Sequence, residues 1–99
     1  MDYALICKAF ADSNRLQIIE LLSEGEKCGC RILERFNITQ PTLSHHMRIL
    51  CESSLVNIRK DGKWCYYSLN ADTLGKFKEY VADLYTRNQE NEESQCEKI

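Results

Sequence analysis

Apolar residues recur at intervals of three and four in five stretches of this sequence, a spacing typical of amphipathic helices. The first stretch covers residues 4–10. The second follows Asp12 to Asn14, whose side chains suit an N-cap, and it ends at Gly25 with Leu16 on its predicted inner face. The other three predicted helices cover residues 30–36, 40–50 and 71–87.

Residues 55–60 and 63–69 form the exception to this helical pattern. Both segments are rich in β-branched and aromatic residues, and Asp61-Gly62 between them is typical of a two-residue hairpin turn. Three helices, a further capped helix, a hairpin and a last helix follow one another in that order. This order predicts a mainly α (α+β) fold, the winged helix-turn-helix, with helices plus one β-hairpin wing.

A chain of 99 residues makes one domain and leaves no room for a second. We expect residues 1–87 to form the DNA-binding and dimerisation domain, and the polar, acidic residues 88–99 to form a disordered tail. A compact winged core would leave parts of the apolar stripes of the terminal helices uncovered. The sequence therefore predicts a homodimer that assembles through these helices.

The overall charge of the chain conceals a basic segment. The formal net charge is −2 and the pI about 5.7, which alone argue against a nucleic-acid-binding protein. Residues 27–67, however, carry seven lysines and arginines against three acidic residues, whereas residues 79–99 carry six acidic residues against two basic ones. This separation predicts one basic face that could meet DNA.

Six cysteines need a chemical explanation that depends on the compartment. The chain begins Met-Asp-Tyr without the basic residues of a signal peptide, and it lacks an apolar run of about 20 residues. We therefore expect a cytoplasmic protein that does not associate with a membrane. Thiols stay reduced there, so metal binding or burial explains these cysteines better than disulfides do.

The helix that begins near Gln40 is predicted to read DNA. If Leu43, Met47 and Leu50 face the core, polar side chains lie on its outer side, where they can contact base edges and phosphates. Lysines and an arginine near the hairpin tip could hold the DNA backbone. The expected DNA-binding residues are Gln40, Thr42, Ser44, His45, Arg48, Arg59, Lys60 and Lys63.

Cys28 and Cys30 form the candidate ligand site, because two thiols one residue apart can bind a soft ion. On an intact helix these side chains would diverge by about 200°, so one ion could hold both only by bending the backbone. Gly29 between them would ease that bend. The ordinary alternative is burial, but the polar surroundings of the pair argue against it.

Four segments together resemble the ArsR/SmtB family of dimeric winged-helix repressors, and the resemblance covers roughly residues 4–74. The segments are residues 11–16 (ADSNRL), 28–30 (CGC), 44–47 (SHHM) and 59–64 (RKDGKW). The resemblance implies a repressor of operator DNA, without enzymatic activity or an organic cofactor. It also implies that As(III) or Sb(III), as arsenite, antimonite or an organoarsenical, binds the cysteine thiolates as inducer and releases the operator.

The resemblance leaves the remaining ligands of the site open. Arsenic-sensing members often have a third cysteine three residues after the second, where this chain has Leu33. A third thiolate could come from Cys7 or Cys96, while Cys51 and Cys65 are expected to be structural. The alternatives are a repressor of the same fold that responds to cadmium, lead or zinc, or one that senses thiol oxidation. A zinc site on the last helix is rejected because residues 71–87 contain no histidine.

Overall fold

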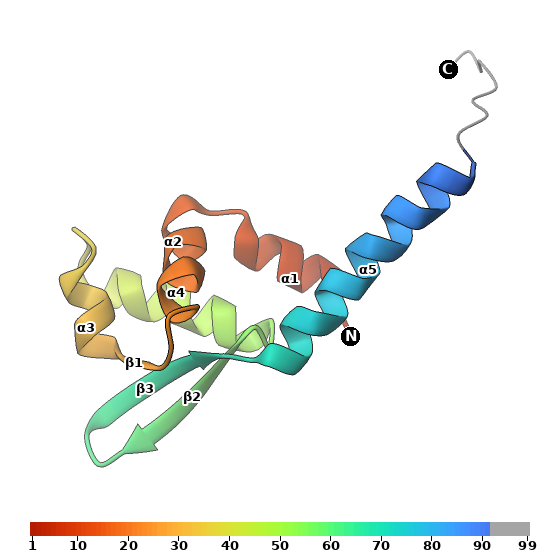
Figure 1. The fold of residues 1–99 in the computed structure, drawn as a ribbon. Coiled ribbons are helices and arrows are strands. Elements are labelled where there is room, and N and C mark those ends of the chain that lie inside the picture. The colour runs from red at the N-terminus through yellow and green to blue at the C-terminus, as the bar shows by residue number, and fades with distance from the viewer. Residues whose placement is uncertain (92–99) are drawn as a thin grey trace.

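Five helices and a three-stranded antiparallel sheet build residues 1–91, the part of the chain that the computed structural model describes (Figure 1). In chain order the elements are α1 (Tyr3–Phe10), α2 (Ser13–Leu22), β1 (Lys27–Cys28), α3 (Gly29–Glu34), α4 (Gln40–Glu52), β2 (Val56–Asp61), β3 (Trp64–Leu69) and α5 (Ala71–Glu90). The predicted winged helix-turn-helix architecture is therefore confirmed. The short strand β1 was not predicted.

The hydrophobic core lies where α1, α2, α3 and α4 meet the base of the sheet. Its largest fully buried side chains are Ile6, Ile18, Ile32, Leu50 and Leu55. The prediction that Leu16 faces this core was wrong, because its side chain remains 41% exposed. Arg15 is buried instead, so a polar group occupies part of the inner face of α2.

Buried Arg15 joins three helices through hydrogen bonds. Its Nε donates to the carbonyl oxygen of Ala9 at 3.0 Å and its Nη2 to that of Lys8 at 3.1 Å, which satisfies carbonyls at the C-terminus of α1. Its Nη1 lies 3.2 Å from Nδ1 of buried His46 on α4. Asp12 caps α2 through the backbone N–H groups of Asn14 and Arg15. These contacts fix the position of α4 relative to α1 and α2.

Strands β2 and β3 form the hairpin wing, and β1 adds a third strand beside β3 (Figure 1). Asp61 pairs with Trp64, so the turn residues are Gly62 and Lys63. The predicted turn, Asp61-Gly62, was therefore one residue early. Gly62 has a φ of +62° at the first turn position, where glycine avoids the strain that a side chain would cause.

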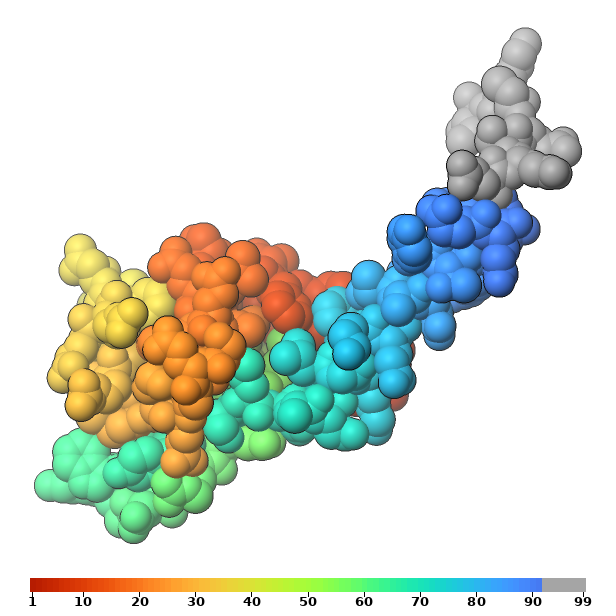
Figure 2. Space-filling view, in the orientation of Figure 1, coloured from red at the N-terminus to blue at the C-terminus, as the bar shows by residue number. Residues whose placement is uncertain are grey.

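Helix α5 projects away from the remaining elements (Figures 1 and 2). Its first half packs on α1 through aromatic contacts, with the rings of Tyr3 and Tyr80 stacked 4.1 Å apart. Farther along the helix, Val81, Leu84 and Tyr85 are exposed. The predicted boundary at residue 87 falls inside α5, and the rest of the predicted tail from residue 92 onward lies outside the described residues. Within residues 1–91, no helix combines the length and apolar character needed to cross a membrane.

Acidification is expected to destabilise the fold through His46. Burial lowers the pKa of His46 below its usual value, and the cation of Arg15 acts in the same direction, although Asp12 opposes both. Below about pH 6.5 the unfolded chain therefore binds a proton that the native chain does not bind, and the free energy of unfolding falls as pH falls. Urea denaturation at pH 7.5, 6.5 and 5.5 measures this dependence.

The neighbouring histidine provides the matched control for this prediction. His46→Asn keeps an acceptor for Arg15 but cannot titrate, so it should weaken the dependence of stability on pH between 7.5 and 5.5. His45→Asn changes an exposed residue and should leave that dependence intact. Equal pH dependence in the wild type and the His46→Asn variant would contradict the account.

Candidate functional site

Cys28 and Cys30 lie side by side at the junction of β1 and α3. Cys28 is the N-cap of α3, with an extended backbone (φ −66°, ψ 145°), and Cys30 lies in the first turn of the helix. Their Sγ atoms are 2.7 Å apart, and the backbone N–H of Cys30 donates to Sγ of Cys28 at 3.4 Å. The prediction that the two thiols diverge on an intact helix was wrong, because Cys28 precedes the helix. The two sulfur atoms therefore meet without any bend in α3.

The two thiols share a hydrogen bond that separates their acidities. The thiol of Cys30 as donor lowers the pKa of Cys28, and the backbone N–H groups of Cys30 and Arg31 and the charge of Arg31 add to this effect. The same hydrogen bond raises the pKa of Cys30, which acts as the donor. The first proton to leave the pair therefore leaves a thiolate on Cys28.

This arrangement provides two soft donors but not three. Residues 1–91 contain no cluster of three or more His, Cys, Asp or Glu side chains placed to hold a metal ion. Cys7 lies exposed on α1, Cys51 is half-buried on α4, and Cys65 is half-buried on β3. Cys96 lies outside the described residues. Two thiolates suit trivalent arsenic or antimony, while the four-ligand site of a cadmium or zinc sensor is not formed within residues 1–91.

The thiol pair is attached directly to the wing. Cys28 pairs with Tyr66 in the antiparallel register of β1 and β3. Next to this strand, the carboxylate of Glu26 accepts two hydrogen bonds from the guanidinium of Arg59 on β2, at 2.8 and 3.1 Å. The guanidinium also lies over the ring of Tyr66, 4.5 Å from its centroid. A backbone ladder and a bidentate ion pair thus connect the thiol site to both strands of the wing.

The contact of Glu26 with Arg59 was not predicted from the sequence, and Arg59 was expected to bind DNA alone. The two residues are 33 positions apart and no local pattern connects them. Arg59 is held by Glu26 in this structure, so a contact with DNA would require it to leave that carboxylate or to share its donors. The remaining predicted wing residues are both exposed, Lys60 on β2 and Lys63 in the turn.

The outer face of α4 carries the other predicted DNA-binding residues, all of them exposed: Gln40, Thr42, Ser44, His45 and Arg48. Thr39 begins the helix by accepting a hydrogen bond from the backbone N–H of Thr42. Nη2 of Arg48 lies 3.1 Å from Nδ1 of His45, which holds these two side chains together. His46, by contrast, is buried. One face of α4 is therefore polar and open, and its other face is fixed to the core.

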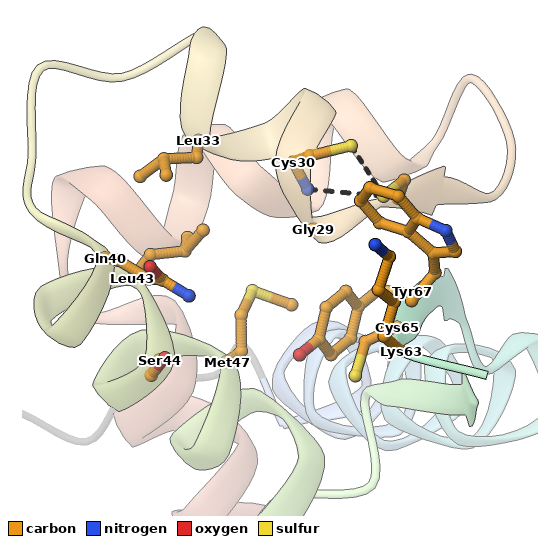
Figure 3. Close-up of a pocket in the computed structure, with 12 residues that line it drawn as sticks. Gly29, Cys30, Leu33, Gln40, Leu43, Ser44, Met47, Lys63, Cys65 and Tyr67 are labelled. Carbon is orange, nitrogen blue, oxygen red and sulfur yellow. Dashed lines mark hydrogen bonds between the residues drawn. The ribbon is translucent and has the colours of Figure 1, made fainter. Parts of the chain in front are cut away.

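A cavity of about 360 Å³ lies between the thiol pair, α4 and the wing (Figure 3). Its apolar wall comes from Leu33, Leu43, Met47, Trp64 and Tyr67, and its polar edge includes Gln40, Ser44 and Lys63. This cavity could not be predicted from the sequence, because its walls come from three separate segments.

Comparison with known proteins gives a consistent result. The model of the family described as "Bacterial regulatory protein, arsR family" matches residues 12–57. An arsenical resistance operon repressor of Staphylococcus aureus is 41% identical, over 99% of this chain and 91% of that protein. A crystal structure of a possible transcriptional regulator for arsenical resistance is 28% identical, with a TM-score of 0.71 over 79% of this chain and 81% of that chain.

A second solved structure adds information on assembly. It is the solution structure of a homodimeric winged helix-turn-helix DNA-binding domain from Mycobacterium bovis, described as a possible ArsR-family transcriptional regulator. The two chains are 25% identical, with a TM-score of 0.68 over 96% of this chain and 87% of the other.

Alkylation should distinguish the two thiols. At pH 7 we expect iodoacetamide to modify Cys28 several-fold faster than Cys30, because the lowered pKa of Cys28 increases its thiolate fraction. Cys28→Ala removes the hydrogen-bond acceptor that raises the pKa of Cys30, so Cys30 should react faster in that variant. Peptide mapping by mass spectrometry measures each rate. Equal rates at the two cysteines in the wild type would contradict the shared hydrogen bond.

Proposed function

The chain belongs to the arsR family of bacterial regulatory proteins, and from this premise we propose a homodimeric repressor that leaves its operator when trivalent arsenic or antimony binds Cys28 and Cys30. Family membership and the winged fold make the protein a DNA-binding transcriptional regulator and not an enzyme. The identity of the inducer and the residues that bind it belong to the proposal. Such a repressor would act in the cytoplasm, where its thiols stay reduced.

The observation that carries the proposal is the pair of sulfur atoms 2.7 Å apart beside the wing. Trivalent arsenic and antimony are soft and favour thiolates. Cys28 supplies a thiolate readily, and Cys30 supplies a second sulfur without rearrangement of α3. Neither carboxylates nor histidines lie close enough to complete a site for a harder ion within residues 1–91.

DNA binding is proposed to use the open face of α4 and the wing. Gln40, Thr42, Ser44 and His45 would enter the major groove, where amide and hydroxyl groups can read base edges. Arg48 would meet a phosphate, and Lys60 and Lys63 would hold the DNA backbone beside the groove. Arg59 retains a supporting role, because its contact with Glu26 positions β2.

A homodimer is proposed because α1 and α5 leave apolar side chains in solvent. Leu5 on α1 and Val81, Leu84 and Tyr85 on α5 are all exposed in the single chain. The similar protein from Mycobacterium bovis is homodimeric. Pairing of these helices would bury the exposed side chains and present two copies of α4 to a two-fold operator.

Release of the operator would begin with separation of the two sulfurs. An arsenic or antimony atom needs more room than the proton that Cys28 and Cys30 share at 2.7 Å. Their separation would shift the backbone of Cys28 in β1 while α3 keeps its place, and β1 is hydrogen-bonded to β3 of the wing. The wing lysines would then shift relative to α4, so the dimer fits its operator less well. A ligand acts in this way because it favours one of two arrangements.

Oxidation of the pair is the second candidate function, since close thiols of unequal acidity also suit a redox sensor. The release experiment separates the two. Fluorescence anisotropy of labelled operator should fall on addition of arsenite or antimonite in peroxide-free buffer, and peroxide without metalloid should have little effect. Cys28→Ser/Cys30→Ser should bind operator as the wild type does but should no longer respond to arsenite.

Cys7→Ser serves as the matched control for this release experiment, because it changes an exposed thiol on α1. It should respond to arsenite as the wild type does. If the double variant still releases the operator on addition of arsenite, the proposed sensing site is wrong. A stronger response to cadmium than to arsenite, lost in Cys7→Ser, would instead favour the cadmium, lead or zinc alternative.

The wing lysines should appear in the salt dependence of operator binding. Lys60→Ala and Lys63→Ala should each reduce the slope of log K against log salt by about 0.9 if each lysine neutralises one phosphate. Lys78→Ala, on exposed α5 away from the wing, should leave the slope unchanged. Titrations of operator binding between roughly 50 and 300 mM salt measure the slope. Phosphate contacts change the affinity steeply over about this range. An unchanged slope in both wing variants would exclude this contact.

A further inference from the structure

The cavity beside the thiol pair is larger than an ion held by two sulfur atoms needs. Cys28 and Cys30 line this space of about 360 Å³ together with apolar side chains of α3, α4 and the wing (Figure 3). A cavity of about 150 Å³ is enough to bind benzene in an engineered protein interior. There is therefore room for a small organic group directly beside the sulfurs.

The wall of the cavity is apolar where a third donor would be needed. Leu33 lies three residues after Cys30, on the same face of α3, and lines the cavity with it. Cys65 also lines the cavity, but within residues 1–91 it does not form a three-residue ligand cluster with Cys28 and Cys30. Trivalent arsenic bound to Cys28 and Cys30 would keep one further bond to fill.

An exposed aromatic side chain forms part of the wall of this space. Trp64 is 47% exposed although its ring is large and apolar, and Tyr67 and Met47 line the same cavity. Exposed aromatic surface beside a polar edge is typical of a ligand pocket. The cavity thus combines two reactive sulfurs at one end with apolar and aromatic contacts along its length.

We propose that this site is selective for monosubstituted trivalent organoarsenicals, with the organic group seated between Leu33, Met47, Trp64 and Tyr67. This inference rests on the proposed function of Cys28 and Cys30. Each thiol gives its proton to a hydroxide that leaves arsenic as water, so two sulfur–arsenic bonds form and two arsenic–oxygen bonds break. Arsenic stays trivalent, its carbon bond is unchanged, and no oxidant or reductant is required.

The same placement connects the organic group to DNA binding. Gln40 and Ser44 of α4 and Lys63 of the wing lie along the edge of the cavity. A group seated there stands between the helix and the wing that are proposed to grip DNA. A substituted arsenical should therefore release the operator at lower occupancy than arsenite, which leaves the cavity empty.

Equilibrium competition against dithiothreitol tests the inference. Dithiothreitol offers two thiols without a pocket, so it cancels the intrinsic difference in sulfur affinity among arsenicals. Relative to dithiothreitol, the wild type should hold phenylarsenous acid about tenfold or more tightly than methylarsenous acid, which corresponds to burial of about two methylene-sized groups. Native mass spectrometry reads the one-to-one adduct directly, without operator DNA.

Three variants make the outcome specific. Leu33→Phe fills the cavity and Trp64→Ala removes an exposed wall, so each should abolish most of the phenyl preference. Leu33→Cys adds a third thiol and should raise the affinity for arsenite while it reduces the preference for substituted arsenicals. Operator binding in the absence of arsenical checks that each variant is folded. If Leu33→Phe does not fold, Trp64→Ala still tests the inference.

The inference is overturned if the wild type shows no preference for phenylarsenous acid. It is also overturned if that preference remains in both Leu33→Phe and Trp64→Ala. In that case arsenite could still release the operator through Cys28 and Cys30, so the proposed function would stand. If Cys28→Ser/Cys30→Ser still binds phenylarsenous acid with wild-type affinity, both the proposed function and the inference fail.

Discussion

Pairing of two residues, Lys27 and Cys28, with β3 is the constraint on which the candidate site depends. It holds the backbone of Cys28 in an extended conformation, which makes this residue the N-cap of α3 and brings its sulfur against that of Cys30. It also makes the ligand site part of the same sheet as the wing. The Glu26–Arg59 ion pair strengthens this connection at the surface, where such a contact alone would contribute little. The backbone of Cys28 can therefore not move without disturbing the wing.

A second constraint fixes the helix that is proposed to read DNA. Arg15 binds carbonyls at the end of α1 and Nδ1 of His46 on α4, so one buried guanidinium sets the relative positions of three helices. Because His46 is held neutral, Nδ1 can accept the hydrogen bond from a cation. The hydrogen-bonding needs of this buried group are met, and no buried side-chain polar atom within residues 1–91 lacks a partner. The inner face of α4 packs on the core, and its outer face is therefore exposed to solvent.

The sequence predicted what local patterns determine and missed what distant contacts decide. Helical periodicity and the hairpin signature were sufficient to predict the winged fold and the open face of α4. Leu16 followed the helical period but lies in solvent, because the contacts of Arg15 determine how α2 is oriented. Cys28 was assigned to a helical environment because a two-residue strand has no detectable period, and Glu26 could not be matched with Arg59 across 33 residues. The cavity depended on three segments that only the folded chain brings together.

The central claim is that the thiol pair and the operator are coupled, and its most direct test is reciprocity. Trp64 is the only tryptophan in the chain and borders the cavity next to the thiols, so its fluorescence should report arsenical binding. The measurement compares the affinity of the free dimer and of the operator-bound dimer for the same arsenical. The account predicts that operator DNA weakens this affinity by the same factor by which the arsenical weakens DNA binding, on the order of 5- to 150-fold. An arsenical affinity that operator DNA leaves unchanged would contradict it.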